Sequence, residues 1–332
     1  MTIYRRSVQI LYEDVYELEK RLKKSEFPLN VAIEITNRCN LNCIMCNNDK
    51  LTRPRGYMNM ELYRKIVDEI AEKSPHARVW LDFYGEPLLA QYKLYFMIDY
   101  AKKRGLTNIC MNTNATLLNR EMADMLLDSG IDFISFDVYG FSKEVLERVS
   151  RGADRDKIYE NVAYFLERKR RRGLTDMVAE VKVLDLPENH AEVEQILSYW
   201  RERGAWTTRR RAITWGGKVE IDALKRQETK RAACGYAVGL CAITWEGNVA
   251  TCALDADAET TFGNVRDESI ADIWARRNRK LVELHLAHRF GELPSVCQRC
   301  QDWRIIGEER WDDEGRSLVK SYDPEKKMLA GH

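Results

Sequence analysis

Short apolar runs of strand length alternate with amphipathic stretches of helix length over most of the chain. Helix-like stretches carry apolar residues every three or four positions, whereas strand-like runs are mainly apolar and short. The runs that predict strands lie at 31–36, 79–84, 108–113, 131–138, 177–184 and within 206–215. The stretches that predict helices lie at about 60–73, 92–103, 119–130, 143–150, 156–171 and 190–203.

Such alternation predicts six β-α units in succession. Units of this kind form parallel strands joined by right-handed crossovers, with helices covering the sheet. Asn59 and Asn119 stand where a helix begins and can accept a hydrogen bond from its first turn. Before the first strand, Leu11, Val15 and Leu18 follow helical spacing, so we predict an N-terminal helix within residues 1–27.

Composition narrows the class of protein. The chain has 332 residues, of which 45% are hydrophobic and 32% charged, with a formal net charge of +1. This balance does not favour nucleic acid as a partner. No apolar run reaches the roughly 20 residues of a membrane span, and the first residues do not resemble an export signal. Nine cysteines in such a chain predict a reducing, cytoplasmic setting and metal binding.

The most informative stretch follows the first predicted strand and contains Cys39, Cys43 and Cys46. Three thiolates so close together suit an iron–sulfur cluster, which normally takes four thiolates, so one iron would remain open to another ligand. A zinc site is the alternative. Structural zinc sites usually close with four nitrogen or sulfur ligands, and no fourth ligand follows nearby.

This Cys-x3-Cys-x2-Cys spacing resembles the signature of radical S-adenosylmethionine (SAM) enzymes. The resemblance implies an α/β fold, a partial (β/α)6 TIM barrel, spanning residues 28–217. It also implies that Cys39, Cys43 and Cys46 hold a [4Fe-4S] cluster whose fourth iron binds SAM. One electron from the cluster then cleaves SAM to a hydrogen-abstracting 5'-deoxyadenosyl radical. Met45 replaces the aromatic residue that many members place before the third cysteine, and a thioether can also pack on adenine.

Further SAM contacts follow from the same resemblance. Gly85, Glu86 and Pro87 resemble a Gly-Gly-Glu-Pro motif that binds the SAM amino group, with Tyr84 in place of the first glycine. Other expected SAM contacts are Asn112, Ser135 and Arg151. A Gly-Pro turn, a strand-end cap and a solvated charge are the alternative interpretations of these positions. Three consecutive arginines at 209–211 suit either an anionic substrate or solvent.

A second set of cysteines lies beyond residue 218, where the alternation stops. Cys234 and Cys252 flank a predicted hairpin that turns at 245–248, and Cys297 and Cys300 form a Cys-x2-Cys pair. The set resembles the SPASM or shorter twitch extension of radical SAM enzymes, over residues 218–310. The resemblance implies that these four cysteines hold one auxiliary [4Fe-4S] cluster, while a zinc knuckle fits the spacing too. Cys241 aligns with an apolar residue of that family. Residues 311–332 read as a charged tail.

The resemblance implies a radical SAM oxidoreductase or lyase that abstracts hydrogen from a sugar, aminocyclitol or sugar-nucleoside. Dehydrogenation in natural-product biosynthesis is the favoured reaction; dehydration, epimerisation and decarboxylation are related ones. A flavodoxin or ferredoxin would supply electrons. The alternatives are a peptide-modifying maturase and a non-catalytic metal-binding scaffold. The acid or base on the substrate side stays open among Tyr84, Asp137, Tyr139, Glu180 and Arg210.

Overall fold

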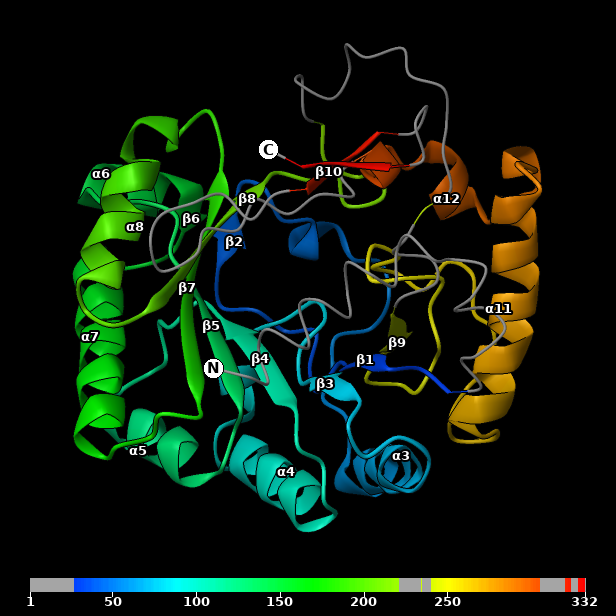
Figure 1. Ribbon diagram of the computed structural model, residues 1–332, viewed down its shortest axis with the longest axis horizontal. Coiled ribbons are helices and arrows are strands. Elements are labelled where there is room, and N and C mark those ends of the chain that lie inside the picture. Colours follow the sequence, from blue (N-terminus) through cyan, green and yellow to red (C-terminus); the bar gives the residue numbers. More distant parts are fainter. Residues whose placement is uncertain (1–26, 221–233, 235–239, 305–319, 324–327, 332) are drawn as a thin grey trace.

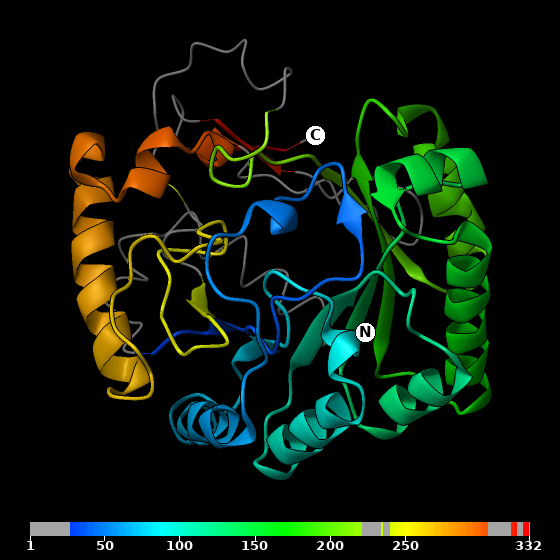
Figure 2. The same ribbon diagram turned by 180° about the vertical axis from the view of Figure 1, so that it is seen from behind.

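The protein is described from a computed structural model that covers residues 27–220, 234, 240–304, 320–323 and 328–331. The predicted N-terminal helix within 1–27 lies almost entirely outside the described residues and stays a prediction. A single parallel sheet crosses the molecule, with its helices on the outer side (Figure 1, Figure 2). The α/β class and the partial barrel predicted from the sequence are therefore confirmed.

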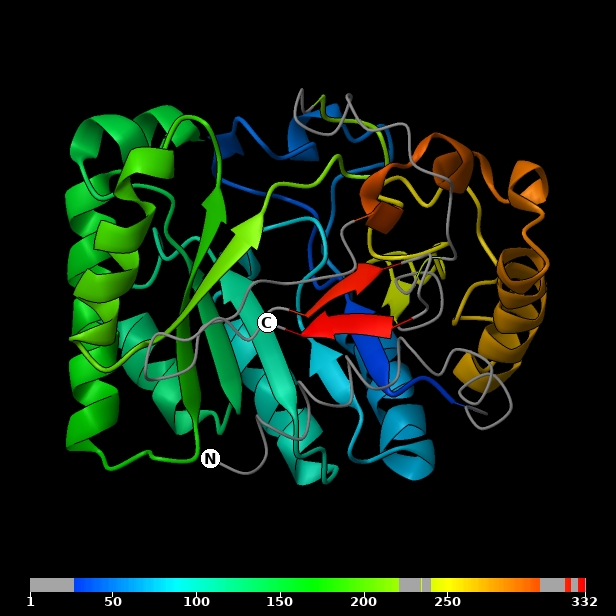
Figure 3. The same cartoon turned by 45° about the horizontal axis from the view of Figure 1, so that its top comes forward.

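All six predicted strands form, and each pairs in parallel with the strand of the preceding unit. They are β1 (Asn30–Ile33), β3 (Arg78–Trp80), β4 (Ile109–Thr113), β5 (Phe133–Asp137), β7 (Val178–Asp185) and β8 (Trp206–Arg211). Figure 3 shows β4, β5, β7 and β8 side by side. Every residue of β1 is buried, as expected for a parallel strand covered on both faces.

The sheet has a seventh strand that the sequence did not predict. β9 (Cys241–Ile243) comes from the second cysteine region and pairs in parallel with β1, so that the order is β8-β7-β5-β4-β3-β1-β9. The chain then turns at Thr244–Gly247 and returns beside β9, where Ala250 N donates to Ala242 O over 2.9 Å. The predicted hairpin is thus present, and its first strand also extends the barrel.

Short polar side chains cap the helices, at the two predicted positions Asn59 and Asn119 and also at Ser269. Asn59 accepts from Leu62 N, Asn119 from Met122 N and Ser269 from Asp272 N. The helices are α3 (Met60–Lys73), α4 (Tyr92–Lys103), α5 (Arg120–Asp128), α6 (Lys143–Val149), α7 (Arg155–Arg171), α8 (Val193–Arg201), α11 (Ile270–Leu286) and α12 (Ser295–Arg299). The 3-10 helices are η1 (Asn48–Lys50), η2 (Pro87–Ala90), η3 (His190–Glu192), η4 (Phe290–Glu292) and η5 (Asp302–Arg304).

Two small antiparallel pairs lie outside the main sheet. β2 (Asn42–Cys43) pairs with β6 (Ser150–Arg151), and β10 (Lys320–Asp323) pairs with β11 (Met328–Gly331). The first pair ties the loop of the first three cysteines to the segment after α6. The second pair falls within the predicted charged tail and is visible in Figure 3.

Candidate active site

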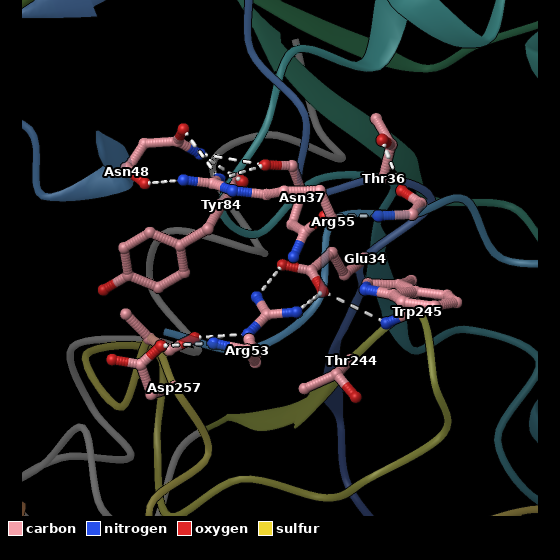
Figure 4. Close-up of polar contacts among 12 residues, drawn as sticks. Glu34, Thr36, Asn37, Asn48, Arg53, Arg55, Tyr84, Thr244, Trp245 and Asp257 are labelled. Carbon is pink, nitrogen blue, oxygen red and sulfur yellow. Dashed lines mark hydrogen bonds and ion pairs between the residues drawn. The ribbon is translucent and has the colours of Figure 1, made fainter. Parts of the chain in front are cut away.

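The loop that follows β1 carries the first three cysteines and is held by polar side chains rather than by regular structure. Asn48 Nδ2 donates to Tyr84 O over 2.7 Å, and Arg55 Nη1 donates to Asn37 O over 2.7 Å and to Asn48 Oδ1 over 2.9 Å (Figure 4). These bonds tie the loop to itself and to the segment after β3. The protein's own polar groups therefore support the shape of the loop.

Cys39, Cys43 and Cys46 line one cavity of about 250 Å³ at the carboxyl ends of the strands, which is where barrel enzymes place their chemistry. Burial raises the pKa of Cys43 to about 12 and of Cys46 to about 11, and burial also raises the pKa of Cys39. Metal ligation requires the thiolate form. A bound cluster would therefore supply the positive charge that these buried sulfurs need in order to ionise.

Gly85 and Glu86 stand at the same cavity and contact the cysteine loop directly. A Cβ atom at Gly85 would collide with Thr36 O and lie 2.9 Å from Arg38 O, so only glycine fits between the two segments. Glu86 N donates to Arg38 O over 2.9 Å. The Glu86 carboxylate accepts from Leu88 N, Thr113 Oγ1 and Asn114 N over 2.7–3.0 Å. Burial raises its pKa to about 7.

The four remaining predicted SAM contacts, Asn112, Pro87, Ser135 and Arg151, fall in four different places. Asn112 lines the cavity. Pro87 is buried at the first position of η2, and Ser135 is fully buried inside the barrel, where Oγ donates to Glu180 Oε2 over 2.7 Å. Arg151 is exposed and is not among the residues lining the cavity, whereas its neighbour Ser150 is.

A charged network across the cavity was not found from the sequence. Asp82 Oδ2 accepts from Asn112 Nδ2 over 2.8 Å, and Lys182 Nζ donates to Asn112 Oδ1 over 2.7 Å. Lys182 Nζ also lies 2.9 Å from Asp137 Oδ1. Burial raises the pKa of Asp82 to about 6. The four residues come from β4, β5, β7 and the end of β3, so only the sheet register brings them together.

The five candidates for the acid or base on the substrate side do not all lie at the cavity. Tyr84, Asp137, Tyr139 and Arg210 line the cavity, as does Arg211. Glu180 instead lies inside the barrel and accepts hydrogen bonds from Ser135 and Thr208. Of the three consecutive arginines, Arg209 faces away and pairs with Asp185 over 2.6 Å. The arginine run is thus divided between the cavity and the surface.

Three of the cysteines in the two sets accept the same local hydrogen bond. The backbone N–H two residues further on donates to Sγ, from Asn48 to Cys46 over 3.4 Å, from Leu254 to Cys252 over 3.3 Å and from Asp302 to Cys300 over 3.3 Å. Hydrogen bonds to sulfur help to set the reduction potential of iron–sulfur clusters. The two cysteine sets therefore share a backbone arrangement suited to thiolate ligands.

Cysteines of the second set lie close enough to interact electrostatically, because burial and the charge of Cys234 raise the pKa of Cys252, and burial and the charge of Cys252 raise the pKa of Cys300. Among the described residues, no three Cys, His, Asp or Glu side chains are drawn together as ligands of a single metal. Zinc holds its sulfurs at about 2.3 Å from one centre, whereas a cubane distributes its thiolates over four irons.

Arg277 provides a second observation on this site. It is fully buried on α11 and donates to the backbone carbonyl of Thr251. No carboxylate in the described part of the chain pairs with it. Burial lowers its pKa, whereas the charges of Cys241, Cys252 and Cys297 oppose that shift. A buried guanidinium beside cysteines, with no carboxylate partner among the described residues, fits an anionic cluster, because the cluster would supply negative charge.

Comparison with known families agrees with this geometry. A family model described as the radical SAM superfamily matches residues 33–199, and a model of the SPASM iron–sulfur cluster-binding domain matches residues 234–301. The chain belongs to the radical SAM superfamily and carries a SPASM domain. It is an enzyme that uses a [4Fe-4S] cluster with SAM together with auxiliary iron–sulfur binding. The non-catalytic scaffold is therefore wrong as an alternative.

Two curated relatives differ in what they act on. The tungsten-containing aldehyde ferredoxin oxidoreductase cofactor-modifying protein of Pyrococcus furiosus is 27% identical, over 73% of this chain and 79% of that protein. The SAM-dependent 2-deoxy-scyllo-inosamine dehydrogenase of Niallia circulans is 22% identical, over 85% of this chain and 96% of that protein.

Two solved structures share the fold. BtrN in complex with AdoMet and 2-DOIA is 19% identical, covers 88% of this chain and 99% of that chain, and has a TM-score of 0.61. SuiB of Streptococcus suis bound to precursor peptide SuiA is 13% identical, covers 91% and 76%, and has a TM-score of 0.64. Within the described residues, no helix is long and apolar enough to cross a bilayer.

Proposed function

We propose that this enzyme abstracts hydrogen from a hydroxyl-bearing small molecule, a sugar, aminocyclitol or sugar-nucleoside, in natural-product biosynthesis. The proposed reaction is oxidation by dehydrogenation, and a dehydration, epimerisation or decarboxylation is the related alternative. The observation that carries the proposal is the charged network of Asp82, Asn112, Lys182 and Asp137 in the same cavity as the three cysteines. Carboxylate, amide and ammonium groups are the partners that a polyhydroxylated molecule requires. The dehydrogenase relative, matched over 96% of its length, supports the same substrate class.

The site residues divide into three groups in this proposal, and Asn112 belongs both to the SAM group and to the charged network. Cys39, Cys43 and Cys46 would hold the cluster, and Gly85, Glu86 and Asn112 would hold SAM, since all six line one cavity. When bound, the cluster and SAM supply reducing power and the group that takes a hydrogen atom from substrate carbon. Cys234, Cys252, Cys297 and Cys300 would hold the auxiliary cluster, which would accept the second electron of an alcohol oxidation.

Oxidation of the substrate alcohol also requires a side chain that accepts the hydroxyl proton. Asp137 suits this task because it lines the cavity and its side chain is 23% exposed. Lys182 Nζ lies 2.9 Å from its carboxylate, and Tyr139, hydrogen-bonded to Asp137, can help to orient it. We therefore assign Asp137 as the general base and Lys182 as the residue that orients the substrate hydroxyl.

The assignment predicts the behaviour of an Asp137→Asn variant. Product formation should fall about a hundredfold or more, the usual loss for a general base, while 5'-deoxyadenosine still forms. The assay uses anaerobically reconstituted protein, reductant, SAM and a panel of aminocyclitols, sugars and nucleosides deuterated at the carbinol carbon. Deuterium in 5'-deoxyadenosine and a ketone product are the expected readouts. Asp185→Asn is the matched control, because Asp185 pairs with Arg209 outside the cavity lining.

A peptide substrate is the competing proposal, since SuiB bound to its precursor peptide shares the fold. Precursor peptides join the same panel. If 5'-deoxyadenosine acquires deuterium from a peptide and from no polyol, the peptide proposal replaces the carbohydrate proposal. A flavodoxin or ferredoxin donor and a cytoplasmic location belong to the proposal as well, and replacing dithionite with reduced flavodoxin tests the donor.

A further inference from the structure

Two aromatic side chains lie between the two sets of cysteines, and the function proposed above uses neither. Tyr84 occupies the position where the resembled motif has its first glycine. Trp215 belongs to the turn after β8, beyond the arginine run. Both line the cavity of the first three cysteines. Their rings pack edge to face, with centroids 5.4 Å apart and an interplanar angle of 60°.

Trp215 is bonded to the first cysteine loop by its side chain. Its indole Nε1 donates to Met45 O over 2.6 Å, between the second and third cysteines of that loop. Its backbone φ is +51°, a left-handed conformation that is an outlier for a bulky residue and persists only where the surroundings impose it. The orientation of the indole is therefore set by the fold and not by local preference.

The backbone around Trp215 is bonded to the second cysteine set. The buried Asp302 carboxylate accepts from Thr214 N over 2.5 Å and from Gly216 N over 2.9 Å, and Asp302 N itself donates to Cys300 Sγ. A Cβ at Gly216 would lie 2.9 Å from Leu254 O, two residues after Cys252. The turn thus touches the segments of two auxiliary cysteines while its indole reaches the first loop.

Tyr84 is the second ring of the pair and is buried beside Trp215. Its side chain is 3% exposed, and its hydroxyl has no hydrogen-bond partner among the described residues. Burial holds its pKa well above the usual range, and the thiolate charges of Cys46 and Cys252 raise it further. One ring is thus near a cysteine of each set. Asn48, which donates to Tyr84 O and whose N–H donates to Cys46 Sγ, fixes the backbone beneath it (Figure 4).

We propose that the Tyr84 and Trp215 rings form the path by which an electron passes between the two iron–sulfur sites. In this step the auxiliary site would lose one electron and the SAM-binding site would gain it. The electron released by substrate oxidation would thus replace the electron that SAM cleavage consumes. No bond forms or breaks and no proton moves. The proposal rests on the two cluster sites and is independent of the substrate.

The rings act as a medium for the electron and are not themselves oxidised. Oxidising a phenol releases its proton, and no described group stands beside the Tyr84 hydroxyl to accept it. Two aromatic rings in edge-to-face contact also conduct an electron better than the saturated side chains or water that would otherwise fill the space. The aromatic ring is therefore required, and the hydroxyl is not.

The test follows one electron inside the reconstituted full-length protein. Less than one electron per chain is introduced by flash photoreduction with S-adenosylhomocysteine bound, because that molecule is not reductively cleaved. Samples frozen at successive times report each cluster by electron paramagnetic resonance, with Cys46→Ser and Cys252→Ser proteins supplying reference spectra. Iron content and both reduction potentials are measured alongside, because a general structural defect would change those as well as the rate.

Tyr84→Phe should redistribute the electron at the wild-type rate, and Tyr84→Leu should be slower by an order of magnitude or more at unchanged iron content and potentials. A wild-type rate in fully loaded Tyr84→Leu would overturn the proposal. Equal slowing in Tyr84→Phe would assign the role to the hydroxyl and overturn it too. If Tyr84→Leu does not load both clusters, Trp215→Leu must show the slowing, with Trp215→Phe as its control, and a wild-type rate there rejects the path.

Discussion

At the scale of single residues, Glu86 connects burial to ligand binding. Its carboxylate accepts three hydrogen bonds yet has a pKa of about 7, because burial outweighs them. Near neutral pH the free protein therefore holds this group part protonated. In the proposed site the SAM amino group binds the ionised form of Glu86, and SAM binding below pH 7 would then release the proton.

We predict that affinity for S-adenosylhomocysteine, which carries the same amino acid group, is nearly constant above pH 7. It should weaken by about tenfold per pH unit below pH 7. Isothermal titration in buffers of different ionisation enthalpy measures both the affinity and the released proton. Glu86→Gln should bind more weakly at pH 8 and lose the slope. A slope that survives in Glu86→Gln would mean that another group, such as Asp82, carries the proton.

Some residues at this scale could be predicted from the sequence and others could not. The three cysteines of the first loop and Gly85-Glu86 are close in sequence to a strand end, so a spacing pattern finds them. Asp82 and Lys182 come from the end of β3 and from β7, and they meet only through Asn112 and the sheet register. The backbone of Arg151 pairs with the cysteine loop through β6, but its side chain is exposed and does not line the cavity, which the sequence pattern does not reveal.

At the scale of elements, a buried ion pair joins the barrel to the SPASM domain. Glu34 follows β1 and is fully buried; Arg53 pairs with it and donates through Nε to Ala256 O over 2.6 Å (Figure 4). Trp245 N, in the turn after β9, donates to the same carboxylate over 3.1 Å. One carboxylate therefore anchors the cysteine loop and the hairpin that extends the sheet.

Removing the cation should be strongly destabilising. Arg53→Met leaves Glu34 as an uncompensated buried charge and should lower the free energy of unfolding by about 3–5 kcal/mol. The double variant Glu34→Leu with Arg53→Met should recover most of that loss, apart from about 1 kcal/mol for the acceptor that Trp245 N loses. Urea denaturation of the three proteins provides the measurement. A double variant no more stable than Arg53→Met alone would contradict the electrostatic explanation.

The elements also show why the barrel was easier to predict than its seventh strand. Helices α3, α5 and α11 begin at Asn59, Asn119 and Ser269 because capping is a local property of sequence. The hairpin turn near Gly247 is local as well. The pairing of β9 with β1 joins residues more than two hundred positions apart. No periodicity within 240–250 specifies that partner.

At the scale of the whole molecule, two clusters predict a defined iron content. Reconstituted protein should contain about eight iron atoms per chain, and Cys252→Ser about four. The variant should still form 5'-deoxyadenosine while losing the oxidised product, because only the second electron lacks an acceptor. Cys241→Ala is the matched control, since Cys241 is buried in β9 and is not one of the four assigned ligands.

Metal analysis and electron paramagnetic resonance of these proteins separate the remaining alternatives for the second cysteine set. Stoichiometric zinc in place of the second four irons would establish a zinc knuckle there. If Cys241→Ala contains as little iron as Cys252→Ser, Cys241 must be among the ligands of the auxiliary cluster, and the assigned set is wrong.

The β9 strand limits where the chain can be truncated or joined to a relative in a chimaera. Glu34 N donates to Ile243 O over 2.9 Å, and β1 has β9 as its neighbour on that side. Cutting the chain after β8 would leave the edge of β1 unpaired, and such edges invite association between molecules. A chimaera that exchanges SPASM regions between relatives must therefore carry β9 and its partner residues with the barrel. A crossover point after the hairpin would preserve this pairing, whereas a crossover point between β8 and β9 would separate the two strands.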